Sequence, residues 1–158
     1  MAGKVVEVGK AVPAFKLEAT NETQVQLTKL KGKKVVIYFY PKDDTPGCTT
    51  ESNDFGANYK EFKRAGVEIF GVSRDSIKSH ERFKDKFDFP FELISDPEEE
   101  LCKNFNVIKE KNMYGKKFMG IERSTFVIDE EGVLVKEWRK VRVPGHVDEV
   151  LEFIKSAL

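Results

Sequence analysis

Val35-Val-Ile-Tyr-Phe-Tyr40 is an unbroken apolar run, rich in β-branched and aromatic residues. A run of this length without polar alternation predicts a strand buried on both faces, as occurs inside parallel or mixed sheets. Pro41 follows at once and ends the strand, because proline has no backbone N–H for the ladder. This run therefore predicts the centre of the fold, and the neighbouring patterns decide the fold class.

Further strands and helices are predicted on the C-terminal side of this run. Three more segments have strand patterns: 67–72, 124–128 and, after the hairpin turn 129–132, 133–138. Helical patterns cover one stripe from Cys48 through Phe55 to Phe62, a weaker stripe over 77–87, a short helix opened by Pro97, and an amphipathic C-terminal helix over 147–154. This order predicts an α/β, thioredoxin-like fold with a central mixed β-sheet flanked by helices.

Composition limits the class of protein. The 158 residues suit one domain over 1–158, and 27 basic residues balance 27 acidic ones. Without a net charge or a basic run, nothing predicts binding to nucleic acid or to an anionic membrane. No long apolar stretch opens the chain, so we expect a cytoplasmic protein.

The segment with the chemistry is Tyr40-Pro-Lys-Asp-Asp-Thr-Pro-Gly-Cys-Thr-Thr-Glu51. Thr45 suits a helix N-cap and Pro46 the first helical position, which places Cys48 in the first turn. Free N–H groups and the positive end of the helix dipole there favour thiolate over thiol. The alternative is a small buried apolar cysteine. We expect the polar loop before Cys48 to keep it out of the core.

A set of motifs at matching spacing carries a family resemblance. Pro41-x-x-x-Thr45-x-x-Cys48 resembles the active-site signature of peroxiredoxins, and Phe39 to Glu51 resembles the bacterioferritin-comigratory-protein (PrxQ) branch. The segments 71–76, 107–115 and 122–128 resemble the same branch, so the resemblance covers nearly the whole chain. It implies a thiol-dependent peroxidase that reduces hydrogen peroxide and organic hydroperoxides, with no cofactor and no metal.

The resemblance also implies a role for each of five residues. Cys48 matches the peroxidatic cysteine, which a peroxide oxidises to a sulfenic acid. Thr45 matches the hydroxyl that binds the peroxide, and Pro41 the residue that shields the pocket from water. Arg123 matches the arginine that stabilises thiolate and peroxide, and Glu51 a residue that holds it. Fixed donors would stabilise the charge that moves onto the departing oxygen.

Each supporting residue also has a simpler interpretation. Thr45 could be only a helix cap, and Pro41 only a strand terminator. Arg123 could pair with Glu122 or Asp129 at the surface, where an ion pair contributes little. Glu51 could be a solvated helix residue.

The residues that would reduce the oxidised Cys48 differ from those of many members of this branch. Asn53 and Lys84 occupy the positions where many members carry a resolving cysteine. Cys102 is the other cysteine, and its neighbours Leu101 and Phe105 favour a buried structural thiol. We therefore expect a one-cysteine cycle with an external thiol as reductant: thioredoxin, glutaredoxin or glutathione.

Other functions fit less well. A thiol–disulfide oxidoreductase predicts a Cys-x-x-Cys pair, and a cysteine phosphatase predicts an arginine soon after the cysteine; neither pattern occurs. A peroxide sensor or chaperone that keeps the thiol stays an alternative, which catalytic turnover would separate. His80 and His146 are expected at the surface or at helix caps, and the polar segment 109–120 could border the site or be only a long connection. We expect a monomer.

Overall fold

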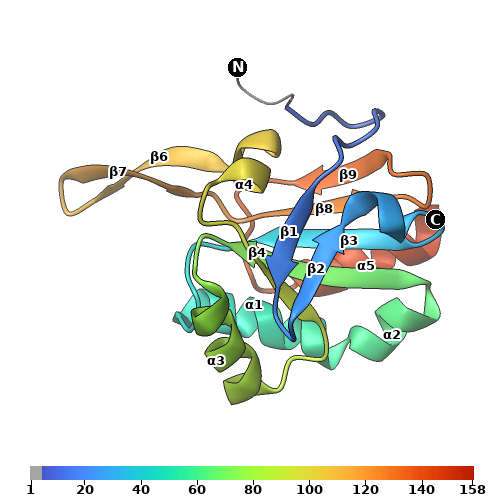
Figure 1. The fold of residues 1–158 in the computed structure, drawn as a ribbon, viewed down its shortest axis with the longest axis horizontal. Helices are drawn as coiled ribbons and strands as arrows, with labels where there is room; N and C mark the ends of the chain where they lie inside the picture. Colours follow the sequence, from blue (N-terminus) through green and yellow to red (C-terminus); the bar gives the residue numbers. More distant parts are fainter. Residues whose placement is uncertain (1–4) are drawn as a thin grey trace.

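A computed structural model describes residues 5–158, so the first four residues of the predicted domain lie outside the description. It contains nine strands, five α-helices and one 3-10 helix (Figure 1). The bounds are β1 Lys16–Ala19, β2 Thr23–Gln26, η1 Leu27–Leu30, β3 Lys34–Phe39, α1 Pro46–Ala57, α2 Tyr59–Arg64, β4 Val67–Ser73, α3 Ile77–Phe87, β5 Glu92–Ser95, α4 Glu100–Asn104, β6 Ile108–Met113, β7 Lys116–Ile121, β8 Ser124–Ile128, β9 Leu134–Trp138 and α5 His146–Ala157.

Strand β3 lies inside a seven-stranded sheet with the order β2-β1-β5-β4-β3-β8-β9. It pairs in parallel with β4 and antiparallel with β8. The residues from Val35 to Tyr40 are 0–1% exposed, because both faces of the strand are covered. The prediction of a central mixed sheet flanked by helices is confirmed.

Each face of the sheet has its own hydrophobic core, and alternate residues of β3 serve the two cores. Ile37 and Phe39 pack into a cluster with the N-terminal segment, β1, β2 and α4. Val36 and Tyr38 pack into the other cluster, which contains apolar residues of α1, α2, α3 and α5. The sheet therefore separates two packed layers of side chains.

The sequence patterns missed several elements. The short strands β1, β2 and β5 were not predicted, since four-residue segments carry little periodicity. The predicted long helix is two helices, divided at Asn58, whose backbone (φ −101°, ψ 8°) leaves helical geometry and whose side chain donates to the Asp54 carbonyl. The short helix predicted from Pro97 begins at Glu100.

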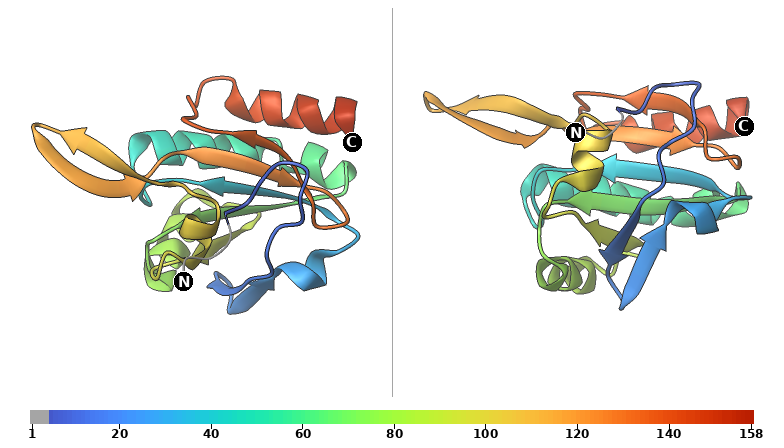
Figure 2. Two further views of the ribbon diagram at one scale, coloured as in Figure 1. Left: turned by 90° about the horizontal axis from the view of Figure 1, so that it is seen from above. Right: turned by 45° about the horizontal axis from the view of Figure 1, so that its top comes forward.

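The segment 109–120 is a β-hairpin, formed by β6 and β7, and not an irregular polar connection. It makes its own two-stranded sheet. Figures 1 and 2 show it projecting from the rest of the molecule, with its turn farthest from the seven-stranded sheet. Among the residues from 5 onward, no helix is both long and apolar enough to cross a membrane.

We expect Gly71→Ala to destabilise the fold. Gly71 lies in β4, where an added Cβ would come within 2.8 Å of the Leu93 side chain and the Tyr38 ring. Overpacking of a core costs about 1–3 kcal/mol, and urea denaturation should show a loss of this size in the free energy of unfolding. Gly56→Ala is the control: its Cβ would meet Pro90 at an ordinary 3.4 Å within α1. An equal urea midpoint for Gly71→Ala and Gly56→Ala would contradict the packing argument.

Candidate active site

Cys48 lies in the first turn of α1, directly after the loop that leaves β3. The sequence placed the residue correctly, but its burial was predicted wrongly. Cys48 is only 1% exposed and packs in the core cluster that contains Tyr38 and Phe55. The thiol is therefore held at the boundary between the helix start and the core, where polar contacts are few and fixed.

Arg123 is the charged group that contacts this sulfur. Its Nη2 donates to Cys48 Sγ at 3.3 Å, and its Nη1 donates to Glu51 Oε1 at 2.7 Å. Arg123 precedes β8, and the pairing of β8 with β3 brings it to the site from 75 residues away. The alternative of a surface pair with Glu122 or Asp129 is wrong, since the Arg123 side chain is 16% exposed and paired with Glu51.

Glu51 is buried on α1, one helical turn after Cys48, and is not the solvated residue of the simpler interpretation. Burial raises the pKa of its carboxyl to about 7, although Arg123 opposes the shift by charge and by hydrogen bonding. Within the described part of the chain, its Oε2 is buried and has no hydrogen-bond partner. The ion pair with Arg123 therefore leaves one carboxylate oxygen of Glu51 buried without a hydrogen bond, which costs desolvation free energy.

Gly47 makes room for the guanidinium and was not among the predicted site residues. A Cβ at this position would come within 3.2 Å of Arg123 Nη2, the nitrogen that donates to Cys48. Any larger residue would push against that nitrogen. The sequence shows that Gly47 precedes Cys48, but it does not show that Gly47 lies against Arg123.

Thr45 and Pro41 flank the loop before α1. Thr45 occupies the N-cap position, as predicted, but its side chain makes no capping hydrogen bond. Its Oγ1 instead donates to the Lys42 carbonyl at 2.8 Å. Pro41 follows β3 and is half-buried. In residues 5–158, no hydrogen bond joins Thr45 to Cys48, and the roles of Thr45 and Pro41 stay predictions.

His80 is completely buried on α3, which contradicts the predicted surface position. Its Nδ1 lies 2.7 Å from Asp43 Oδ2, and its Nε2 donates to the Ile94 carbonyl at 2.9 Å. Asp43 belongs to the loop between β3 and α1. The imidazole therefore ties this loop to α3 and β5, through residues 37 positions apart that no local pattern connects.

Asp43 has further partners that fix the loop. Its carboxylate accepts from Tyr40 at 2.6 Å and from Ser79 at 2.7 Å, and its backbone N–H donates to Asp75 at 3.0 Å. Asp43, Asp75 and His80 bring ligand-type atoms within 4.8 Å of one another. Because protein hydrogen bonds already use these atoms, the cluster is better described as a clamp on the loop than as a cation site.

His146 is also buried, so its predicted surface or capping position is wrong. It is 5% exposed at the start of α5, where Gly145 takes the N-cap position. Burial lowers its pKa to about 4, and its Nε2 lies 2.7 Å from Thr125 Oγ1. A neutral imidazole here joins α5 to β8.

Cys102 lies in the other core, on the opposite side of the sheet from Cys48. It is completely buried, and burial together with nearby Asp96 raises the pKa of its thiol far above the usual range. Both cysteines are free. The predicted inward packing of Cys102 is confirmed, and a thiol in this state is a poor nucleophile.

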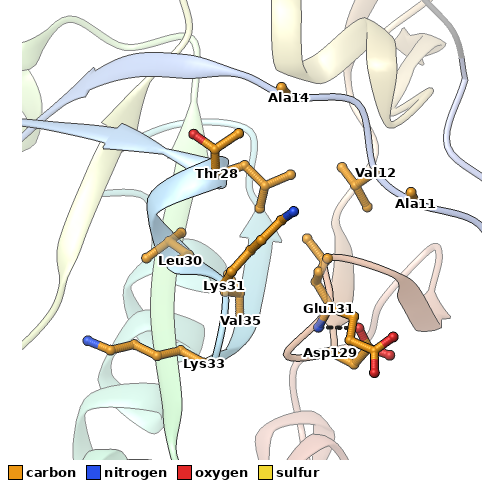
Figure 3. Close-up of a pocket in the computed structure, with 13 residues that line it drawn as sticks. Ala11, Val12, Ala14, Thr28, Leu30, Lys31, Lys33, Val35, Asp129 and Glu131 are labelled. Carbon is orange, nitrogen blue, oxygen red and sulfur yellow. Dashed lines mark hydrogen bonds between the residues drawn. The ribbon is translucent and has the colours of Figure 1, made fainter.

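A cavity of about 200 Å³ lies away from this chemistry. Figure 3 shows Lys31 and Val35 on one side of it and Val12 on the other. Val35 belongs to the beginning of β3, whereas Cys48 follows its end. The lining contains no cysteine or histidine, so the candidate active site remains the group around Cys48.

The chain is similar to known proteins over nearly its whole length. The model of the AhpC/TSA family matches residues 8–137. Peroxiredoxin Bcp of Xanthomonas campestris pv. campestris is 53% identical over 156 residues, with 99% of this chain and 98% of that protein covered. Peroxiredoxin Bcp of Bacillus subtilis is 49% identical over 151 residues, with 96% of each chain covered.

Solved structures of similar proteins share the fold. Xanthomonas campestris peroxiredoxin Q superposes with a TM-score of 0.89 at 53% identity, with 98% of each chain covered. A structure of the bacterioferritin comigratory protein from the same organism, described for its alkyl peroxide reduction activity, gives 0.88 at 52% identity, again with 98% of each chain covered.

The chain therefore belongs to the AhpC/TSA family, in the Bcp or peroxiredoxin Q branch. It is a thioredoxin-fold, thiol-dependent peroxidase, with a peroxide as substrate and a thiol as reductant.

The raised pKa of Glu51 predicts how stability depends on pH. Between about pH 4.5 and 7 the folded protein keeps a proton that the unfolded chain releases, so stability falls as pH rises through this window. Glu51→Gln removes this titration and retains an acceptor for Arg123. We expect its free energy of unfolding, relative to wild type, to rise by about 3 kcal/mol between pH 4.5 and 8, measured by urea denaturation. A constant difference would contradict the assigned pKa.

Proposed function

We propose that Cys48 is the residue that reduces the peroxide. Its thiolate attacks one peroxide oxygen, an S–O bond forms and the O–O bond breaks. The departing oxygen leaves as hydroxide or alkoxide and takes up a proton, while sulfur is oxidised to a sulfenic acid. The single observation that carries this proposal is the 3.3 Å hydrogen bond from Arg123 to Cys48 Sγ, at the start of a helix.

The surrounding residues have distinct proposed roles. Arg123 stabilises the thiolate and then the charge that develops on the departing oxygen, which is the step where fixed donors accelerate a reaction most. Glu51 holds the guanidinium in position through its 2.7 Å ion pair. Thr45 would turn its hydroxyl from the Lys42 carbonyl to the bound peroxide. Pro41 would exclude water from the loop side of the pocket.

The proposed cycle uses one cysteine of this chain. An external thiol attacks the Cys48 sulfenic acid with loss of water, and a second thiol resolves the mixed disulfide. The separation of Cys48 and Cys102 by the sheet supports this route, because a disulfide needs Cα atoms within about 7 Å of each other. Thioredoxin, glutaredoxin and glutathione are the proposed reductants of this cytoplasmic, monomeric, single-domain enzyme.

Intact mass spectrometry tests the first step. Reduced protein receives one equivalent of hydrogen peroxide, with and without a reagent that traps sulfenic acids. A trapped adduct on Cys48 is the expected result. If Cys48 stays reduced, the peroxidase mechanism is wrong at its first step, and if Cys48 becomes linked to Cys102, the one-cysteine cycle is wrong. Repeated turnover with a reductant separates an enzyme from a peroxide sensor, which oxidises once.

Arg123→Lys should slow the oxidation of Cys48 by about 10²–10³-fold, because lysine keeps the charge but loses the fork that joins Glu51 to the sulfur. Stopped-flow measurement with hydrogen peroxide gives this rate directly. Arg64→Lys is the matched control, since Arg64 makes an exposed ion pair with Glu61. Equal rates of Cys48 oxidation in the two variants would show that Arg123 takes no part in this step.

Cys102→Ser should retain turnover within about twofold with an external thiol, since a buried thiol of strongly raised pKa contributes no nucleophile. Cys48→Ser provides the comparison and should abolish peroxide consumption. Coupled assays with NADPH oxidation measure both. Normal oxidation of Cys48 with loss of turnover in Cys102→Ser would show that Cys102 resolves the sulfenic acid.

A further inference from the structure

The β6–β7 hairpin has two faces of different character. Residues paired across an antiparallel ribbon share a face, and successive residues alternate between faces. The register Lys111↔Phe118 therefore defines one face and the register Glu110↔Met119 the other. We call the first the lysine face; its residues are Lys109, Lys111, Met113, Lys116, Phe118 and Gly120.

Charge is distributed unevenly between these faces. Within the strands β6 and β7, the lysine face holds three lysines and no acidic residue. On the other face, Lys117 forms an ion pair with Glu110 at 3.8 Å. Glu122, the next acidic residue along the chain, lies beyond the end of β7. The lysine face therefore keeps its positive charge, while the opposite face is neutral.

The lysine face also exposes apolar side chains. Met113 is 58% exposed and Phe118 is 42% exposed, although both are large. Exposed apolar side chains with polar groups around them are typical of surfaces that bind another protein. Because the ribbon projects from the body, a partner could approach this face without meeting the sheet (Figures 1 and 2).

The base of this face lies next to the thiol. The stem of Lys111 lies 3.2 Å from the position that a Cβ on Gly120 would take, and Arg123 follows the end of β7 after one intervening residue, Glu122. The ammonium of Lys111 is close enough to Cys48 and Arg123 for their charges to act on its pKa, which burial lowers. A protein seated on the lysine face would therefore have its own edge near the oxidised sulfur.

We propose that the lysine face docks the protein that reduces Cys48, and that this partner presents an acidic surface with an apolar centre beside its reactive thiol. The proposal rests on the peroxidase cycle proposed above. Complementary charge would increase the rate of encounter, and the apolar contacts would orient the partner's thiolate toward the sulfenic acid. That thiolate forms the new S–S bond as water leaves, and a second thiol of the partner displaces Cys48.

A second copy of this chain is a poor occupant. A two-fold dimer places the same patch of each subunit against its counterpart. The lysines of one ribbon would then face the lysines of the other, with no acidic residue on either face of contact. Like charges in such positions oppose association, whereas an acidic partner neutralises them.

Two matched pairs of variants test the proposal. Lys116→Glu and Lys117→Glu reverse the same charge at adjacent positions on opposite faces, and Phe118→Ala and Met119→Ala truncate apolar residues in the same way. The probe is an acidic thioredoxin, regenerated by its reductase and NADPH. We expect Lys116→Glu and Phe118→Ala to lower kcat/KM for thioredoxin about tenfold, and Lys117→Glu and Met119→Ala to stay within twofold. Salt should slow wild type more than Lys116→Glu.

Parallel measurements separate the docking surface from the chemistry. All four variants should match wild type in stopped-flow oxidation by hydrogen peroxide and in turnover with dithiothreitol. If wild type itself shows neither oxidation by hydrogen peroxide nor turnover with dithiothreitol, the peroxidase cycle is refuted. Normal dithiothreitol turnover with equal thioredoxin kinetics in all variants would refute the docking surface alone. Binding to phosphatidylglycerol vesicles that only Lys116→Glu and Phe118→Ala abolish would assign the face to a lipid surface instead.

Discussion

The guanidinium of Arg123 bridges Cys48 and Glu51, and the rest of the site is arranged around this bridge. It contacts the sulfur at 3.3 Å and the carboxylate at 2.7 Å, and both of these partners are buried. Charges in such surroundings interact strongly, but each costs desolvation energy. The sulfur gains a fixed positive neighbour, and the protein carries a buried carboxyl whose pKa is about 7.

Backbone geometry makes this bridge possible. Arg123 lies between the hairpin and β8. The pairing of β8 with β3 sets the distance between the Arg123 guanidinium and the start of α1. Gly47 leaves the space that the guanidinium occupies. The loop between β3 and α1 is held separately, by the hydrogen bonds of Asp43 to Tyr40, Ser79 and His80. The start of α1, which carries Cys48, is thus fixed from two sides, an arrangement that suits the proposed chemistry.

The two cysteines lie in contrasting surroundings. Both are free and almost completely buried. Cys48 meets a guanidinium at a helix start, whereas Cys102 lies in an apolar core near the carboxylate of Asp96, which raises its pKa further. A buried thiol in apolar surroundings is inert, and Cys48 differs from Cys102 by its contact with a cation.

The sequence by itself determined the central strand, the α/β class, the position of Cys48 at a helix start and, through the motif around Pro41, Thr45 and Cys48, the family. These features depend on residues close together in the chain, where periodicity and turn chemistry are informative. The resemblance implied that Arg123 acts on the sulfur and that Glu51 holds it, but only the tertiary structure decided the geometry of these contacts, the burial of Glu51 and His80, and the projecting hairpin at 109–120. Strand pairing and burial are long-range properties, and no local pattern records which distant residues a folded sheet brings together.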